Sequence, residues 1–233
     1  NSWQAKWIWQ AGEESPRNAY WCSRKSFDVP LGAGCVRALI SADSRYSLWV
    51  NGIYIGHGPV RGFAHNWRYD EYDITAHVRS GMNTMAVLVQ HYGHSTFQYV
   101  QARGGLLAQV ECDDKIVAAT DYTWRGVLHP SYNRRTVRMC CQQAWAEDFD
   151  ARVEPLGWTV GNFDDSGWEP AVVVGEVGCE PWTNLSPRDI PFLTQAPVYP
   201  TRLVSTRLAR PPKQIWSMDF KPNLAPGDLS ANT

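Results

Sequence analysis

Short stretches in which apolar and polar residues alternate follow one another along most of the first 120 residues. Alternation over about four to eight residues is typical of a strand buried on one face. Turn residues separate the stretches at spacings of roughly 8–12 residues, which favours an all-β sandwich or barrel. Only the segment 75–81 resembles a helical turn, which Gly81 is placed to end. The predicted strands are 22–29, 35–42, 46–50, 53–56, 69–74, 84–92, 106–112 and 115–119.

Two of the predicted turns are specific enough to pair strands. Asn51-Gly52 lies between two alternating segments. This dipeptide is the strongest short-range hairpin signal, because a type I′ turn needs φ > 0 at both central residues. Asp113-Asp114 has the equivalent place between 106–112 and 115–119. We therefore expect each pair of flanking strands to form an antiparallel hairpin.

The strand pattern weakens after about residue 120, and prolines become frequent between 170 and 200. Proline at this density is typical of an extended linker. Strand character returns over 201–220, including the segment 214–220. We expect one β-sandwich domain over 1–185, followed by a Pro-rich C-terminal extension over 186–233. Because the extension, at roughly 45 residues, is too short to bury a second core, we interpret it as a linker plus the first strands of a truncated following β-domain.

Composition limits the classes of partner that the chain is expected to bind. The 22 Lys and Arg residues nearly balance the 23 Asp and Glu residues, for a net charge of −1. The basic footprint of a nucleic-acid-binding protein is therefore missing. The sequence contains neither an apolar stretch long enough for a membrane span nor a signal-peptide pattern. We expect no nucleic-acid partner and no membrane partner.

The cysteines bear on the cellular compartment. The chain has six of them, with no C-x-x-C pair: Cys22, Cys35, Cys112, Cys140, Cys141 and Cys179. The first three lie within apolar alternating segments, where a free cysteine behaves as a small buried hydrophobe. We interpret the six as reduced structural thiols, which predicts a cytoplasmic location. A secreted, disulfide-bonded protein is the alternative.

No catalytic constellation stands out. Glycoside hydrolysis needs two carboxyl groups across one sugar, but adjacent aspartates such as Asp164 and Asp165 are typical of a turn that caps backbone N–H groups. Glu71 and Asp73 share one strand face, where a solvated face is favoured over a catalytic pair. The motifs G-x-S-x-G, P-loop and H-E-x-x-H do not occur. We expect no catalytic residue in this chain.

Strand direction predicts which loops meet. If each strand crosses the sandwich once, the strand after Asn51-Gly52 leads into the loop 57–68. The strand 84–92 then leads into the loop 93–105 at the same end, where residues 43–45 also lie. Long loops gathered at one end of a sandwich are where binding sites form.

These loops carry side chains suited to a sugar. Most of the twelve tryptophans in the chain are interpreted as packing between sheets, but Trp67 and Tyr99, with Phe63, offer ring faces to a sugar. Asp43 is expected to accept hydrogen bonds from hydroxyl groups. The further polar partners are expected to be Arg61, His65, Asn66, His94, Gln98 and Arg103. Packing of the same loops on a neighbouring domain is the alternative.

Three groups of residues carry a family resemblance. The first is the segment 42–93, with the hairpin Y-x-L-x-V-N-G-x-x-I-G, the run Y-D-I-T and the run G-x-N-x-x-A-V-x-V. The second is F-D-D-S-G-W at 163–168, and the third is G-P-V-R, H-Y-G-H-S-T-F-Q-Y and a late P-R-D-I-P. Together they resemble the N-terminal region of bacterial α-L-rhamnosidases, glycoside hydrolases of the family 78 type. The hairpin alone is shared with β-galactosidase-like and β-glucuronidase-like enzymes.

The resemblance implies a jelly-roll β-sandwich of the galactose-binding-domain type. It also implies a bacterial parent polypeptide that is a glycoside hydrolase, whose chemistry belongs to an (α/α)₆ barrel absent from this sequence. The chain would then be a non-catalytic module that binds carbohydrate, a rhamnose-containing glycan, or shapes the approach of substrate. A purely structural scaffold between domains is the alternative. The implied partner is a downstream catalytic domain. No cofactor is expected; calcium is considered because such sandwiches often hold it in their loops, although no D-x-D-x-D-G loop is present.

Overall fold

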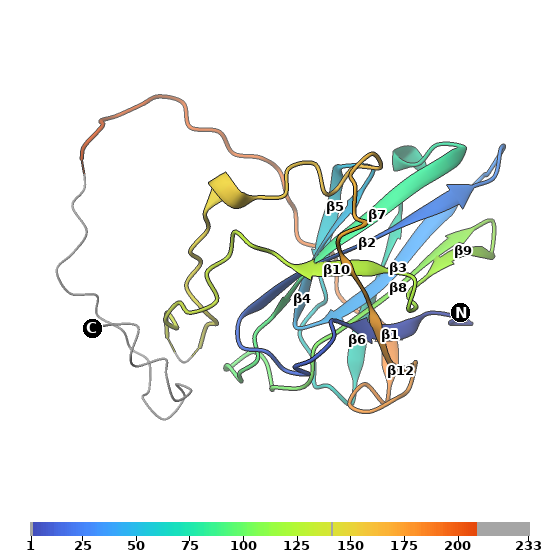
Figure 1. Ribbon diagram of the computed structural model, residues 1–233, viewed down its shortest axis with the longest axis horizontal. Helices are drawn as coiled ribbons and strands as arrows, with labels where there is room; N and C mark the ends of the chain where they lie inside the picture. The colour runs from blue at the N-terminus through green and yellow to red at the C-terminus, as the bar shows by residue number, and fades with distance from the viewer. Residues whose placement is uncertain (1, 141, 209–233) are drawn as a thin grey trace.

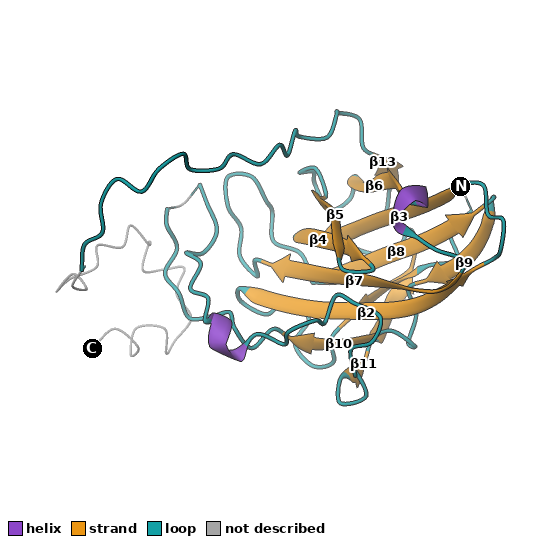
Figure 2. Ribbon diagram, turned by 90° about the horizontal axis from the view of Figure 1, so that it is seen from above, coloured by secondary structure: helices purple, strands orange, loops and turns teal. Residues whose placement is uncertain are grey.

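A computed structural model of the protein describes residues 2–140 and 142–208. Within them the chain forms two β-sheets that face each other across one core (Figures 1 and 2). The helical pieces of this part of the chain are two short 3₁₀ turns, η1 (Thr75–His77) and η2 (Ala151–Val153). The predicted all-β sandwich is therefore confirmed.

Each sheet combines strands from distant parts of the chain. The first sheet has the order β12–β1–β8–β3–β6–β13, with β9 paired to β8, and the second has the order β11–β10–β2–β7–β4–β5. The strands of the first sheet are β1 (Lys6–Trp9), β3 (Val36–Asp43), β6 (Trp67–Asp73), β8 (Gly105–Cys112), β9 (Lys115–Ala119), β12 (Val172–Glu176) and β13 (Leu185–Pro187). Those of the second are β2 (Ala19–Val29), β4 (Arg45–Val50), β5 (Ile53–Gly58), β7 (Gly81–His91), β10 (Arg125–Leu128) and β11 (Glu169–Pro170).

All eight predicted strands are present, with ends that shift by no more than three residues. The prediction that Gly81 ends a helical turn is wrong. The turn ends at His77, and Gly81 begins β7 with a φ of 85°. Five strands were not predicted: β1 and β10–β13. All five are short, and their pairing partners lie far away in the sequence, so no local alternation marks them.

Both predicted hairpins form, for the reason given by their turn residues. Asn51 and Gly52 have φ values of 51° and 82°, and Asp113 and Asp114 have values of 47° and 63°. Positive φ at both central positions is the signature of a type I′ turn. β4 and β5 pair across the first turn, and β8 and β9 pair across the second.

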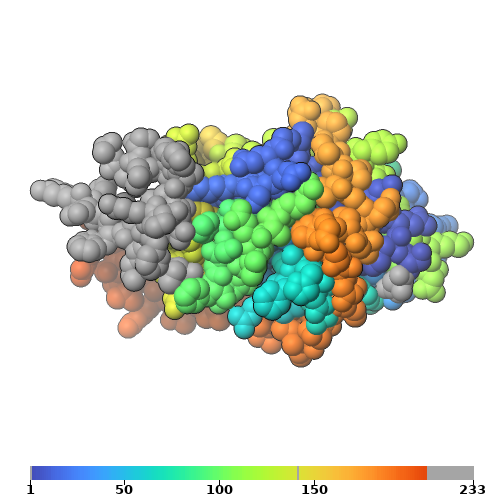
Figure 3. Space-filling model, turned by 90° about the horizontal axis from the view of Figure 1, so that it is seen from below, coloured from blue at the N-terminus to red at the C-terminus, as the bar shows by residue number. Residues whose placement is uncertain are grey.

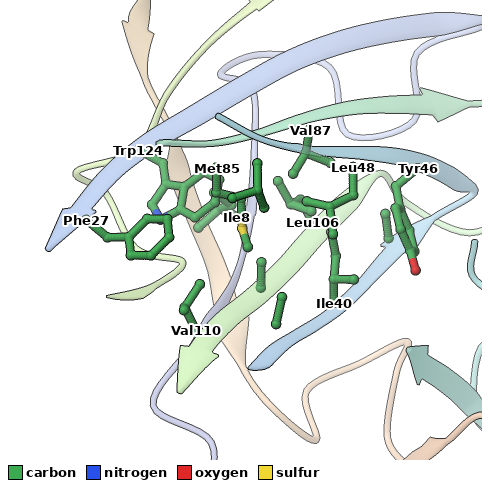
Figure 4. Close-up of a cluster of buried hydrophobic side chains, with 14 of the residues drawn as sticks. Ile8, Phe27, Ile40, Tyr46, Leu48, Met85, Val87, Leu106, Val110 and Trp124 are labelled. Carbon is green, nitrogen blue, oxygen red and sulfur yellow. The ribbon is translucent and has the colours of Figure 1, made fainter. Parts of the chain in front are cut away.

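Alternate residues of the strands meet in the core between the sheets. On the first sheet, β3 supplies Ile40 and β8 supplies Leu106 and Val110, while on the second sheet β4 supplies Leu48 and β7 supplies Val87 (Figure 4). All are at most 1% exposed. The period of two that predicted these strands is therefore the period with which they reach the core.

A second buried layer covers the outer face of the first sheet. It contains Trp7 of β1, Leu107 of β8 and Trp67 of β6, together with Trp182 and Tyr99 from loops. The rings of Trp7 and Trp182 stack with centroids 3.8 Å apart. None of the tryptophans in the described residues is exposed, so packing accounts for the high tryptophan content.

The chain after the sandwich runs as an exposed strap. β13 pairs in parallel with β6, so residues 185–187 belong to the first sheet, and the division predicted at residue 185 stays a prediction. Residues 188–208 contain no strand, which contradicts the strand character predicted from residue 201. Apolar alternation alone does not make a strand, because a strand also needs a partner for its backbone groups. The predicted strand 214–220 lies outside the described residues.

Two further observations concern cysteines and membranes. Cys22, Cys35, Cys112, Cys140 and Cys179 are free thiols in this structure; a cytoplasmic location stays a prediction. In the described part of the chain, no helix has the length and apolar character required to cross a membrane.

Candidate functional site

The two long loops meet as the strand directions predict. A cleft of about 390 Å³ is lined by Arg61 and Phe63 of the first loop and by Phe97, Gln98 and Val100 of the second. Figure 3 shows the loops side by side on one face of the molecule, the first in cyan and the second in green. We refer to this feature as the loop cleft.

Exposed rings border the loop cleft. Phe63 is 62% exposed and Phe97 is 73% exposed. The ring of Phe63 stacks on His65 with centroids 5.7 Å apart. A short bridge between Phe63 and Asn66 closes one loop tip, and another between Thr96 and Tyr99 closes the other. Each tip is thus a small hairpin that presents a phenylalanine to solvent.

Six of the nine predicted sugar-binding residues remain at least partly accessible. Arg61 and Gln98 line the loop cleft, and His65 and Asn66 are exposed beside it. His94 is half-buried near the ring of Trp145, and Arg103 pairs with Glu14 at 3.3 Å. The structure therefore gathers four of these accessible residues, Arg61, His65, Asn66 and Gln98, around the loop cleft, and the largely buried Tyr99 also lines it.

The other three predicted residues are packed inside the protein. Trp67 is 2% exposed, Tyr99 is 5% exposed, and Asp43 is fully buried. The indole N–H of Trp182 donates to Oδ2 of Asp43 at 3.2 Å, and the hydroxyl of Tyr99 donates to Oδ1 at 2.5 Å. In this arrangement the carboxylate binds the second layer of the sandwich and has no face left for a sugar. The ring platforms at the loop tips are Phe63 and Phe97 instead.

A serine, a histidine and an aspartate also line up beneath the loops. Oγ of Ser15 lies 3.1 Å from Nε2 of His91, and Nδ1 of His91 lies 3.5 Å from Oδ1 of Asp43. A nucleophilic triad needs an accessible serine and a site for an oxyanion. Here His91 is completely buried, and Ser15 donates to the carbonyl of Ala102 at 3.0 Å. The arrangement is a buried polar network that ties the N-terminal segment to the second loop.

The paired carboxylates serve local structure. Glu71 forms an ion pair with Arg37 at 2.9 Å, and Asp73 accepts the backbone N–H of Thr75 at 2.9 Å. Asp164 accepts the backbone N–H of Ser166 at 3.0 Å. Hydrogen bonds to the carboxylates lower the pKa of Asp73 and that of Asp164.

Asp165 pairs with Arg24 at 2.7 Å, and the guanidinium of Arg24 also reaches the carbonyls of Phe163 and Val160. The F-D-D-S-G-W segment therefore anchors its turn onto β2. Among the described residues, no three His, Cys, Asp or Glu side chains come together as a metal-binding group. This part of the chain thus offers no carboxylate cluster for calcium.

All three comparisons with known proteins find alpha-L-rhamnosidases. A family model described as the alpha-L-rhamnosidase N-terminal domain matches residues 35–189. The crystal structure of a GH78 family rhamnosidase of Bacillus sp. GL1 is 47% identical, with a TM-score of 0.84 over 86% of this chain and 21% of that chain. An alpha-L-rhamnosidase from Dictyoglumus thermophilum is 25% identical, with a TM-score of 0.62 over 81% of this chain and 22% of its own.

A curated relative is also an alpha-L-rhamnosidase. An alpha-L-rhamnosidase of Streptomyces avermitilis is 25% identical over 189 residues, which is 78% of this chain and 16% of that protein. The chain thus spans about a fifth of the length of the proteins it matches, or less.

Proposed function

Since this chain belongs to the alpha-L-rhamnosidase N-terminal domain family, we propose that it is a non-catalytic module of a glycoside hydrolase. It binds carbohydrate at the loop cleft, with a rhamnose-containing glycan as the ligand, and so shapes the approach of substrate to a catalytic domain. The relatives are named as rhamnosidases over lengths several times that of this chain. The catalytic carboxyl pair would therefore lie outside this chain.

The observation that carries the proposal is the composition of the loop cleft. Two exposed phenylalanine rings flank it, and Arg61 and Gln98 lie beside them. A ring face suits the C–H side of a sugar, while guanidinium and amide groups suit its hydroxyls. A cleft of about 390 Å³ is within the range of small-ligand sites.

Calorimetric titration with L-rhamnose and a panel of other monosaccharides, with calcium and again with EDTA, tests the proposal. We expect a saturable heat for one sugar. Phe97→Ala should lower the affinity for that sugar at least tenfold. Because the ring is exposed, the substitution should not lower the stability of the fold. Tyr122→Ala, which removes an aromatic ring that is 69% exposed and far along the sequence, is the matched control. No heat for any sugar at millimolar concentration would refute this use of the loop cleft.

A structural scaffold is the second candidate, favoured by the strap after β13. Asp70 is completely buried, and Nε of Arg188 donates to its Oδ1 at 2.6 Å. Phe192 stacks on Tyr72 at 4.7 Å, and Gln195 reaches His57 at 3.1 Å. A strap held at three successive points fixes the direction in which the chain leaves the sandwich, which is what a spacer between domains requires.

The two candidates differ in what the loop cleft does. If the chain is a binding module, calorimetry detects sugar binding by the isolated chain, and Phe97→Ala abolishes it. As a scaffold, the same chain binds no sugar, and Phe97→Ala weakens its association with a downstream catalytic domain supplied as a separate polypeptide.

A further inference from the structure

A row of polar side chains crosses the outer face of the second sheet at its loop end. Tyr20 of β2 lies opposite Gln90 of β7, and Gln90 lies opposite Arg45 of β4. In the next row on the same face, Ser47 of β4 lies opposite His57 of β5. Figure 2 shows β2, β7, β4 and β5 side by side across this sheet.

The row forms the floor of a groove. One hollow of about 440 Å³ is lined by the row together with Tyr92, Trp145 and Glu147. An adjoining hollow of about 240 Å³ reaches Ser47 and His57, and it shares Tyr20, Arg45, Gln90 and Glu147 with the first. We call the two together the sheet groove. It crosses four neighbouring strands, a length on the order of 14 Å from strand spacing.

The polar floor contrasts with the rest of the same face. Farther along β2 and β7, Trp158 covers Cys22 and Ala86 and forms a buried hydrophobic cluster with them. The segment that carries Trp158 therefore seals one half of the face. It does not cover the other half, where the floor changes from apolar to polar side chains. There the ring of Tyr132 stacks on Tyr20 with centroids 3.8 Å apart and lines the groove, which stays accessible at Gln90 and Arg45.

Hydrogen bonds hold the floor residues in place. Nε2 of Gln90 donates to the hydroxyl of Tyr20 at 2.7 Å. Arg45 donates through Nη1 to the carbonyl of Pro59 and through Nε to the hydroxyl of Tyr92, the latter at 3.4 Å. Within the described residues, Oε1 of Gln90 and Nη2 of Arg45 are left without a partner. A ligand would thus meet one fixed acceptor beside one fixed donor.

Glu147 supplies a second acceptor at the rim. It is exposed and makes no hydrogen bond or ion pair within the described part of the chain. Its negative charge still reaches the floor. Burial, and after it the charge of Glu147, raises the pKa of Tyr20, and the same causes raise the pKa of Tyr132 to about 12. The phenols therefore stay protonated at neutral pH.

We infer that the sheet groove is a second carbohydrate site, which takes an uncharged oligosaccharide lying across the strands. Each sugar hydroxyl both donates and accepts, so a fixed acceptor beside a fixed donor matches a pair of neighbouring hydroxyls. The positive Arg45 is balanced by the negative Glu147, so the groove does not select an anion. Its open length suits more than one ring. The choice of ligand rests on the proposed function. The sheet groove adjoins the loop cleft, because Thr96 and Gln98 line both, but Gln90, Arg45 and Glu147 lie outside the cleft.

Two-dimensional NMR titration of the ¹⁵N-labelled chain tests this inference, with L-rhamnose and a linear trisaccharide of L-rhamnose as probes and cellotriose as a second trisaccharide. We expect a trisaccharide to shift the amide signals of Gln90 and Arg45. Glu147→Gln and Arg45→Gln should each lower its affinity about tenfold, because hydrogen bonds to charged groups are the strong ones. Glu13→Gln, at an exposed carboxylate outside both sites, should leave it unchanged.

Phe97→Ala separates the two sites. If a trisaccharide binds and its affinity falls in Glu147→Gln and Arg45→Gln but not in Phe97→Ala, the inference holds, even when the loop cleft binds nothing. If L-rhamnose shifts the loop signals while no trisaccharide shifts those of Gln90 and Arg45, the inference is refuted and the proposed function stands. If no probe binds at millimolar concentration, both are refuted.

Discussion

Replacing Arg188 by methionine is expected to destabilise the sandwich far more than a surface substitution would. The carboxylate of Asp70 lies between the sheets with no exposed surface, and the side chain of Arg188 is 11% exposed. Nε of Arg188 donates to Oδ1 at 2.6 Å, and the hydroxyl of Tyr46 donates to Oδ2. Methionine keeps much of the aliphatic stem, but it removes the guanidinium that faces Asp70 and lies 4.5 Å from the ring centroid of Phe192.

The loss of stability expected for Arg188→Met depends on which partners the buried Asp70 keeps. Removing one partner of a buried ion pair costs about 3–5 kcal/mol, because the other charge stays buried without compensation. Asp70 retains the bond from Tyr46, so we expect a loss of about 3 kcal/mol. Replacing both partners, as in Asp70→Asn with Arg188→Met, removes the stranded charge. An amide still accepts from Tyr46, so the double variant should recover about 1–3 kcal/mol of that loss.

Urea denaturation of the wild-type chain, the two single variants and the double variant measures these differences. Arg68→Met is the matched control on the same edge of the sheet. Its partner Asp189 is 58% exposed, so this variant should lose no more than about 1 kcal/mol. The reasoning fails if Arg188→Met loses no more than Arg68→Met, or if the effects of the two changes at Asp70 and Arg188 simply add.

Three further outcomes follow from other contacts. Gly104→Ala should lower the free energy of unfolding by about 1–3 kcal/mol in urea denaturation, because an added Cβ would lie 2.3 Å from the ring of Trp9; an unchanged midpoint would contradict the close packing. Tyr99→Phe should cost about 1–3 kcal/mol, since Asp43 loses a buried donor, and thermal melting detects it as a lower Tm. In alkaline titration followed by phenolate absorbance, Tyr132 should ionise near pH 12, because its folded pKa is raised mainly by burial. The stability that this shift contributes is complete below the unfolded pKa of about 10 and is lost as pH rises through the folded value, so ionisation at pH 10 without unfolding would refute the burial.

Local signals account for the part of the fold that the sequence predicts. The Asn51-Gly52 turn determines its own φ values, and its flanking strands need no distant information to pair. β1 and β12, by contrast, pair residue 6 with residue 176. No local sequence pattern near either segment predicts this pairing. The convergence of the loops could be predicted because it needs only strand direction.

The burial of Trp67 and Tyr99 could not be predicted in the same way. The residues that cover them, Trp7 and Trp182, come from distant parts of the sequence. An aromatic residue in a loop looks the same in sequence whether a distant segment covers it or not. Arg45 and Gln90 also gave no signal, because a polar residue on an outer strand face is what any solvated sheet contains.

One short segment joins the loop cleft to the strap in this structure. The indole of Trp182 donates to Asp43, and Asp43 accepts the hydroxyl of Tyr99 in the second loop. Directly after it, the hydroxyl of Thr183 donates to the carbonyl of His65 at 3.3 Å, and the amide of Asn184 donates to Oδ1 of Asn66 at 3.0 Å. These contacts fasten both loop tips to the chain just before it enters β13 and the strap. The same segment therefore both orders the loop cleft and leads into the strap. In the proposed function, a module built in this way would couple the direction of the strap to the shape of the loop cleft.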